Sequence, residues 1–350
     1  MPSKRPYTVT IDDVARRAGV SISTVSRVVN RTVPVSEEAA ARVQAAMVEL
    51  KYQPRAAARN LATRQTKALG LLLTDISGDF FVPLLRGVEA ATAEAGFSLL
   101  ISTARDGLSH SAGVHNTDGL LIFADGLSES GLRYCHDLGF PLVLIHQSPP
   151  SQLPQPGDIG PAGALNIPCV TVENKAASYR LIEHLIVTHG RHAIGFLRGP
   201  HSQEDSYWRE LGYRQALEAY GLPVDPALVA LGEFDRTVAY ASVAAWLADP
   251  TVAGRLDSIF AGDDESAVGV LAALHDGGKR VPEDVAVVGF DDQTLAAYLA
   301  PPLTTVRAPT EEVGRQAARQ LINLISTGQA DRLTLLPTDL VLRRSCGCQS

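Results

Sequence analysis

The sequence contains no apolar run long enough to cross a bilayer, and its basic start at residues 1–5 is not followed by an apolar signal core. Cysteine is scarce: four occur in 350 residues, and only Cys346 and Cys348 lie close together. No histidine lies near that pair in the sequence, so we interpret all four, including Cys135 and Cys169, as reduced thiols and expect no metal site. These absences predict a cytoplasmic protein without a membrane partner.

Motifs for cofactor binding and catalysis are also missing. No Gly-x-Gly-x-x-Gly follows an expected strand, and there is neither a Gly-x-x-x-x-Gly-Lys-Ser/Thr phosphate loop nor a nucleophile elbow. We therefore expect no bound cofactor and no catalytic residues. The alternative is a sugar-processing enzyme in which Asp263, Asp264 and Asp291 form an acid–base set.

Charge is distributed unevenly along the chain. Residues 1–67 contain 12 Lys and Arg but only 5 Asp and Glu, a net charge of +7, whereas the remainder carries −14. A basic segment on an acidic body is the electrostatic pattern of a protein that binds a polyanion. The acidic isoelectric point of the whole chain therefore does not argue against nucleic acid as a partner.

Residues 10–30 have the pattern of two short helices joined by a tight turn. Thr10 and Asp13 form a capping-box pair at the start of the first helix, and Gly19 permits the positive φ that ends it. Ser21 is placed to cap the second helix, whose outer face would fit the major groove of DNA. On that face we expect Ile22, Ser23, Ser26 and Arg27. A small helical bundle with a solvated polar face would show the same pattern.

The run TIDDVARRAGVSISTVSRVVN at residues 10–30 resembles the N-terminal signature of the LacI/GalR family of bacterial transcriptional repressors. The resemblance continues nearly without gaps to Gly70. It implies a homodimeric regulator that binds a near-palindromic operator in double-stranded DNA. Ile22, Ser23 and Arg27 are expected to contact bases, and Thr24 and Ser26 phosphates. The full set expected to contact DNA is Thr10, Ser21, Ile22, Ser23, Thr24, Ser26, Arg27, Asn30, Arg55, Arg59 and Leu61.

Residues 54–62, PRAAARNLA, could form a helix that is too short and too weakly apolar to be stable alone. A flexible linker is the simpler interpretation. The family resemblance implies instead a hinge helix that orders on operator DNA and inserts Leu61 into the minor groove. The chain has Arg55 where the family usually has asparagine.

From Ala68 onward, short apolar runs alternate with helical patterns, which indicates two doubly wound α/β lobes. Strands are expected at 69–74, 97–102, 119–123, 141–146, 193–197, 258–261, 285–290, 333–336 and 340–342. Helices are expected at 82–95, 128–138, 175–189, 207–220, 238–247, 266–275 and 311–326.

The predicted fold class is a small all-α helix-turn-helix head with a hinge helix, followed by a two-lobed α/β body. The resemblance implies a body like that of periplasmic binding proteins, with two doubly wound parallel sheets and three crossings between lobes, near Glu173, Thr304 and Gln329. The predicted domains are the head at 1–53, the hinge helix and linker at 54–67, the first effector lobe at 68–172 plus 304–329, and the second effector lobe at 173–303 plus 330–346.

The chain departs from the family pattern in three places. Residues 107–117 are too few and too rich in glycine, alanine and serine for the usual crossover helix, which we expect to be missing or vestigial. Residues 148–168 form a Pro/Gly-rich insertion, expected to be an irregular surface segment. Finally, Asp263 stands where the family usually has asparagine.

A cleft at the C-terminal ends of the strands is the expected ligand site. The residues expected to bind a small-molecule effector are Asp75, Phe81, Gln147, Arg209, Phe234, Asp263 and Asp291. Carboxylates and a guanidinium bind sugar hydroxyls through charge-assisted hydrogen bonds, so we expect a sugar or polyol, with a purine or nucleoside as the alternative. Structural roles remain open: Arg209 could pair with a helix carboxylate, Phe81 could belong to the core, and Asp264 and Asp292 could cap helices.

Overall fold

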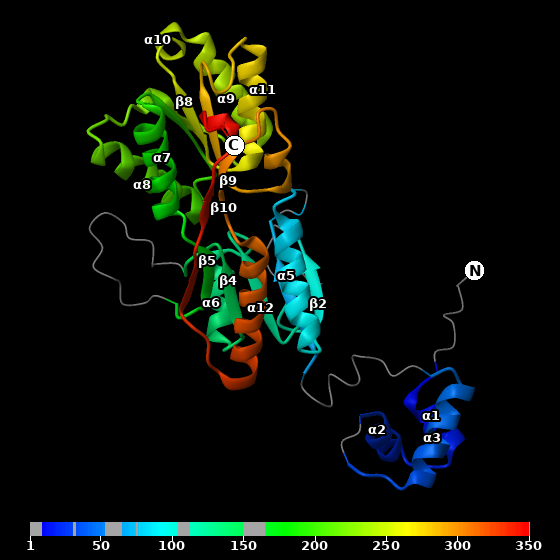
Figure 1. Cartoon of the computed structure of the whole chain (residues 1–350). Coiled ribbons are helices and arrows are strands. Elements are labelled where there is room, and N and C mark those ends of the chain that lie inside the picture. Colours follow the sequence, from blue (N-terminus) through cyan, green and yellow to red (C-terminus); the bar gives the residue numbers. More distant parts are fainter. Residues whose placement is uncertain are drawn as a thin grey trace, which may run out of the picture. The chain divides into compact units, whose positions relative to one another are not determined.

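The computed structural model describes residues 9–30, 33–52, 65–74, 76, 78–103, 113–149 and 165–349. The chain divides into two units after Lys67, one of residues 1–67 and one of residues 68–350 (Figure 1). The expected hinge at 54–62 lies outside the described residues. No helix in the described ranges is long and apolar enough to cross a membrane.

In its described residues, the first unit has three helices, α1 (Ile11–Ala18), α2 (Ile22–Asn30) and α3 (Glu37–Glu49). The capping box at the start of α1 is present: the Asp13 amide donates to Thr10 Oγ1 at 3.4 Å, and the Thr10 amide donates to Asp13 Oδ2 at 3.0 Å. Gly19 ends α1 with φ 65°. Val14, Val25 and Val43, one from each helix, are fully buried in a shared core. The expected helix-turn-helix is confirmed.

The second unit contains two six-stranded sheets. In order across the first sheet lie β11 (Leu333–Leu336), β5 (Cys169–Val172), β4 (Leu142–Ile145), β3 (Gly119–Phe123), β1 (Ala68–Leu72) and β2 (Ser98–Ser102). In order across the second lie β12 (Asp339–Val341), β10 (Thr304–Arg307), β9 (Ala286–Asp291), β8 (Ser258–Ala261), β6 (Ile194–Arg198) and β7 (Val229–Leu231). All the strand pairs are parallel except β10 with β12, which confirms the predicted fold class.

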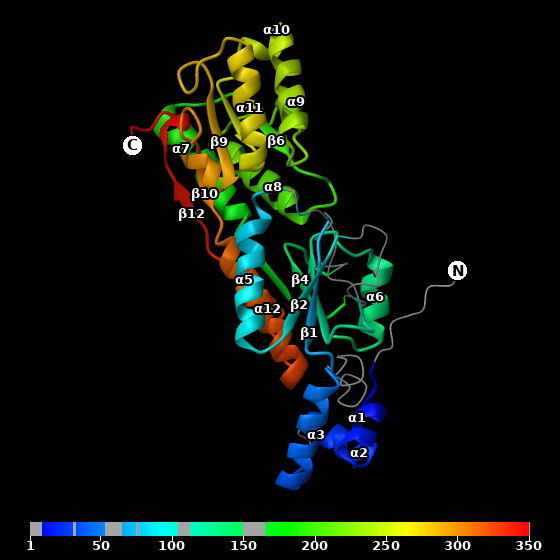
Figure 2. The ribbon, with the colours of Figure 1, turned by 90° about the vertical axis from the view of Figure 1, so that its right-hand side faces the viewer.

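Helices cover both faces of each sheet (Figure 2). On the first sheet, α5 (Phe81–Glu94) and α12 (Thr310–Thr327) pack together on one face and α6 (Glu129–Asp137) lies on the other. Alternate strand residues serve the two faces: Leu121 joins the core of α5 and α12, while Leu120 and Ile122 join that of α6.

The second sheet has the same layered arrangement. The helices α7 (Lys175–His189) and α8 (Glu204–Ala219) pack together on one face, and α9 (Arg236–Ala248) packs with α11 (Asp264–Asp276) on the other. The short helix α10 (Pro250–Ala253) and β7 were not expected from the sequence. Three 3₁₀ helices complete the described elements, at Pro226–Leu228, Thr294–Ala297 and Arg344–Cys346.

Two of the expected lobe boundaries are wrong. Thr304 begins β10, which pairs with β9 in the second sheet, so the chain enters the first lobe only between Arg307 and Thr310. After α12 the chain does not leave at Gln329, because β11 pairs with β5 in the first sheet. The return to the second lobe lies between Leu336 and Asp339.

The two unusual segments of the first lobe are described only in part. Residues 113–118, after the gap that follows β2, contain turns and no helix, and residues 104–112 lie outside the described ranges. Most of the insertion, residues 150–164, lies outside them as well. Its last residues are not a surface segment, because Leu165 and Ile167 are buried in the core beneath α6.

Candidate functional site

A cavity of ≈ 340 Å³ lies between the two lobes, at the C-terminal ends of the strands. Five of the seven expected effector residues line it, namely Phe81, Arg209, Phe234, Asp263 and Asp291. Asp75 lies outside the described residues. Gln147 is not part of the lining; it directly follows the turn after β4, and its Oε1 atom is buried without a hydrogen-bond partner among the described residues.

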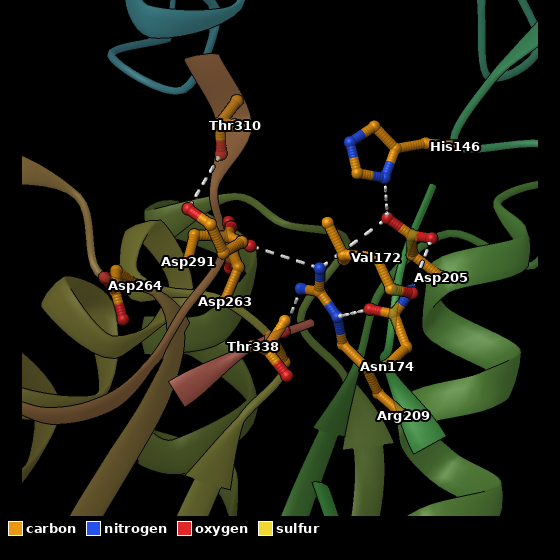
Figure 3. A network of polar contacts seen from close by, with 12 residues as sticks. His146, Val172, Asn174, Asp205, Arg209, Asp263, Asp264, Asp291, Thr310 and Thr338 are labelled. Atoms are coloured by element: carbon orange, nitrogen blue, oxygen red, sulfur yellow. Dashed lines mark hydrogen bonds and ion pairs between the residues drawn. The ribbon is translucent and has the colours of Figure 1, made fainter. Parts of the chain in front are cut away.

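Arg209 is the centre of the polar network shown in Figure 3. Its side chain is 3% exposed and projects from α8. Nε donates to Asn174 Oδ1 at 2.9 Å, one terminal nitrogen donates to the Gly262 carbonyl at 2.7 Å, and the other donates to Asp291 Oδ1 at 3.1 Å. The guanidinium lies 3.8 Å from the centre of the Phe290 ring, a cation–π contact. Such a pre-positioned guanidinium loses little entropy when a ligand binds.

Asp205 connects Arg209 to the first lobe. It lies one turn before Arg209 on α8, with 3.6 Å between the charged groups, and its Oδ2 is 2.7 Å from Nδ1 of His146 at the end of β4. Asn174 donates to its other oxygen at 2.8 Å. Burial raises the pKa of Asp205, but His146, Arg209 and Asn174 outweigh it and hold this pKa below its ordinary value. Asp205 is therefore an ionised carboxylate between the lobes.

Three further carboxyl groups, of Asp263, Asp264 and Asp291, lie near the strand ends of the second sheet, and Asp263 and Asp291 line the cavity (Figure 3). Burial, followed by the nearby Asp291 carboxylate, raises the pKa of Asp263 to about 7. The pKa values of Asp264 and Asp291 are also raised, chiefly by burial. An ionised carboxylate at position 263 would only accept hydrogen bonds, but with this raised pKa the group also carries a proton near neutral pH and can then donate as an amide does.

The helix-cap assignments need correction. Asp263, not Asp264, caps α11, and its Oδ1 accepts from the Ser266 amide at 2.9 Å. Asp264 is fully buried and instead accepts from the Thr305 hydroxyl at 2.6 Å and from the Gln293 amide at 2.8 Å. Asp292 pairs with two arginines, Arg307 at 2.7 Å and Arg343 at 2.6 Å.

Aromatic rings form the apolar side of the cavity. In the first lobe Phe80, Phe81 and Phe123 contact one another at centroid distances of 5.2–5.8 Å, and Phe80 and Phe123 also contact the His146 ring. Phe234 faces them from the second lobe, 5.4 Å from the Arg209 guanidinium. Sugar ring faces and planar bases both fit between such rings.

Four residues around the cavity have a backbone that L-amino acids rarely adopt. The φ angles are 58° at His146, 53° at Glu233, 54° at Phe234 and 104° at Asp291. Positive φ is unusual for non-glycine residues and clusters at functional sites, where the surrounding structure holds it. The residues with positive φ therefore lie at the same strand ends as the residues of the polar network.

Sequence reasoning missed His146, Asn174 and Asp205. His146 precedes the expected Gln147 by one residue, and strand ends cannot be located from sequence to that precision. Asp205 carried a usable signal, since it precedes Arg209 by four residues and so shares its helix face.

The expected DNA-contacting face lies on α2. Ile22 is 50% exposed, and Ser21, Ser23 and Arg27 are exposed as well, while Thr24 and Ser26 are half-buried. Ser21 Oγ accepts from the Thr24 amide at 3.2 Å, as a helix cap does. The hydroxyl of Thr10 is engaged in the capping box of α1. The side chain of Asn30 and the residues Arg55, Arg59 and Leu61 lie outside the described part.

Comparison with known families agrees with both units. Residues 10–55 match the family described as bacterial regulatory proteins, lacI family. Residues 182–346 match the periplasmic binding protein-like domain.

Full-length relatives and solved structures share the whole architecture. The ribose operon repressor of Escherichia coli is 34% identical over 336 residues, which are 94% of this chain and 97% of the relative. A transcriptional regulator CelR–cellobiose complex is 28% identical with a TM-score of 0.68, covering 96% of this chain and 99% of that one. The lac repressor dimer bound to operator and an anti-inducer is 25% identical with a TM-score of 0.79, covering 97% and 99%. With a helix-turn-helix head, a two-lobed body and these relatives, the chain belongs to the LacI family of bacterial transcriptional regulators.

Proposed function

We propose that this protein is a homodimeric repressor whose affinity for operator DNA is set by a neutral sugar bound between the lobes. The observation that carries the proposal is the cavity itself, which is lined by a buried, fully oriented arginine, by carboxyl groups that include Asp205, Asp263 and Asp291, and by a set of aromatic rings. The ribose operon repressor and the CelR–cellobiose complex support a sugar as the class of ligand.

The chemistry of the cavity matches a polyol. Arg209 offers donors, Asp291 and Asp205 offer acceptors, and Asp263 can do either near neutral pH. Vicinal hydroxyls both donate and accept, so they can join a network that offers both kinds of partner. The volume of ≈ 340 Å³ lies at the small end for ligand pockets and favours a small sugar.

Control of DNA binding requires that the sugar bind two lobe arrangements with different affinity. Among the described residues, the contacts that join the lobes include His146 with Asp205, Ser148 with Glu204, and Ser202 with Asp125 at 3.0 Å. They all depend on a closed cleft. A sugar that bridges the Phe81 and Arg209 sides adds to them, and closure is then communicated to the hinge. Both induction and corepression are compatible with this mechanism.

The test is a thermal-shift screen of sugars and nucleosides on the full chain, followed by operator binding with the best ligand. A neutral sugar is expected to raise the melting temperature and to change operator affinity. In Arg209→Ala the response should be lost, while Arg214→Ala, an arginine on the same helix outside the cavity lining, should respond normally. A purine that stabilises the protein when no sugar does would overturn the sugar assignment, and a normal response in Arg209→Ala would move the site elsewhere.

A further inference from the structure

Four potential metal ligands converge in the second lobe, away from the cavity lining. They are His184 and His189 from the last two turns of α7 and Cys346 and Cys348 near the end of the chain. Their ligand atoms all lie within 4.8 Å of one another. No histidine lies near the cysteine pair in the sequence, but the fold brings two histidines beside it from more than 150 positions away.

The distances within this His₂Cys₂ cluster fit one tetrahedral ion. The two histidine Nε2 atoms are 3.2 Å apart, and Cys348 Sγ lies 3.5 Å from each of them. Cys346 Sγ is 3.7 Å from Nε2 of His184. Ideal tetrahedral zinc, with its usual bond lengths, places two nitrogens roughly 3.3 Å apart and a nitrogen and a sulfur roughly 3.6 Å apart. Four of the six distances between ligand atoms therefore already match a zinc site, and the other two are no longer than 4.8 Å.

Two glycines with positive φ lie beside the ligands in the sequence and set the direction of the backbone there. Gly347, between the two cysteines, has φ 110°, and a Cβ atom there would lie 3.1 Å from the His189 ring. This glycine turns the chain so that both sulfurs face the same point, and a larger residue would meet the histidine. Gly190 ends α7 directly after His189 with φ 62°.

Surrounding groups orient the ligands as outer-shell partners do in zinc sites. Nδ1 of His184 is 3.2 Å from the Thr188 hydroxyl, which leaves Nε2 to face the centre. The Thr304 hydroxyl lies 3.0 Å from Cys346 Sγ and 2.8 Å from the Arg343 carbonyl, so its single proton can be donated to either, and donation to the sulfur would suit a thiolate. Cys346 is fully buried.

A hydrogen-bonded cluster would explain each contact separately but not the convergence of four ligand atoms on one point. We propose that His184, His189, Cys346 and Cys348 bind one Zn²⁺ ion. Four protein ligands leave no open coordination position, which is the arrangement of a structural and not a catalytic site. The ion would fasten the end of the chain to α7 and, through Thr304, to β10. This proposal does not depend on the identity of the effector.

The test begins with the full chain, produced in zinc-supplemented medium without a histidine tag. Elemental analysis should find close to one zinc per chain, and at least tenfold less in Cys346→Ser/Cys348→Ser. Cys135→Ala, which removes a buried cysteine from α6, is the matched control and should keep its zinc. A chelator should lower the melting temperature of the wild type and of the control but not that of the double variant.

Cobalt gives a second readout that does not depend on folding yield. The metal-free wild type should develop the visible bands of tetrahedral Co²⁺ and a thiolate charge-transfer band, and His189→Asn should weaken Co²⁺ binding at least tenfold. A folded wild type with less than a tenth of a zinc per chain and no tetrahedral cobalt spectrum would overturn the proposal. A Cys346–Cys348 disulfide in the freshly isolated protein, detected by mass spectrometry, would do so as well.

Discussion

At the scale of single residues, Arg27 tests the assignment of α2 as the helix that reads DNA. Its exposed side chain lies on the last turn of the helix, on the face away from the core residue Val25. Arg27→Ala is expected to cost about 1–3 kcal/mol on the specific operator and to relax its sequence preference. Titration against operator and random DNA measures both effects. Arg42 is an exposed arginine on α3, and Arg42→Ala removes the same charge. This control should weaken binding to operator and to random DNA by the same factor. If Arg27→Ala instead loses the same affinity for operator and for random DNA, Arg27 contacts only phosphate and does not read bases.

Asp263 gives a prediction about pH. Because its pKa is raised to about 7, the folded protein holds a proton that the unfolded chain releases near pH 4. The free energy of unfolding therefore falls as pH rises from about 4 to about 7. Asp263→Asn keeps a good helix cap and removes this carboxyl, so it should stabilise the protein by about 1–3 kcal/mol at pH 8 and much less at pH 5.

Urea denaturation at pH 5 and pH 8 checks the effect of Asp263→Asn. Asp284→Asn serves as the control, because hydrogen bonds from Arg280 hold the pKa of Asp284 far below its ordinary value and its carboxylate stays ionised at both pH values. If Asp263→Asn changes the free energy of unfolding equally at both pH values, Asp263 does not have a raised pKa.

At the scale of elements, the hinge carries a prediction that stays untested because residues 54–62 lie outside the described ranges. Leu61 is the only large apolar residue of that segment, so DNA is its expected apolar environment. Leu61→Ala should weaken operator binding and reduce DNA bending without lowering the melting temperature. Leu138→Ala, an exposed leucine after α6, is the control and should change none of these. If the DNA bend angle is the same with Leu61→Ala as with the wild type, Leu61 does not insert into the minor groove.

For the helices and strands, most of the fold could be predicted from the sequence. Alternation of apolar runs and helical patterns predicted the α/β lobes and nearly all of their helices, because each helix must bury one face. The lobe boundaries implied by the family resemblance placed β10 and β11 in the wrong lobes, and the strand pattern could not correct them, since an apolar strand does not encode which sheet it will join. Of the site, motif matches indicated Arg209 and Asp291. The His146–Asp205 link and the His₂Cys₂ cluster arise from long-range packing that no local pattern contains.

At the scale of the whole molecule, we expect a dimer on a near-palindromic operator, with half-sites about one helical turn apart. Two heads must bind together, because a single helix-turn-helix contacts few base pairs. Sedimentation of the free protein should give twice the chain mass, and a nuclease footprint should protect two inverted half-sites. Inserting half a helical turn between the half-sites should weaken binding strongly, whereas protection of one unrepeated half-site would contradict the dimer.

The three passages between the lobes also govern how the chain can be made. The first sheet is complete only when Leu333–Leu336 is in place, and the second only when Asp339–Val341 is in place. No contiguous fragment therefore contains one whole lobe without a large part of the other, and the ribosome must synthesise almost the entire chain before either sheet has all its strands. Products of premature termination before residue 333 would expose an unpaired edge on both sheets at once, the kind of surface on which chains aggregate. In a cell, such fragments would be substrates for chaperones and proteases and not independent ligand-binding domains.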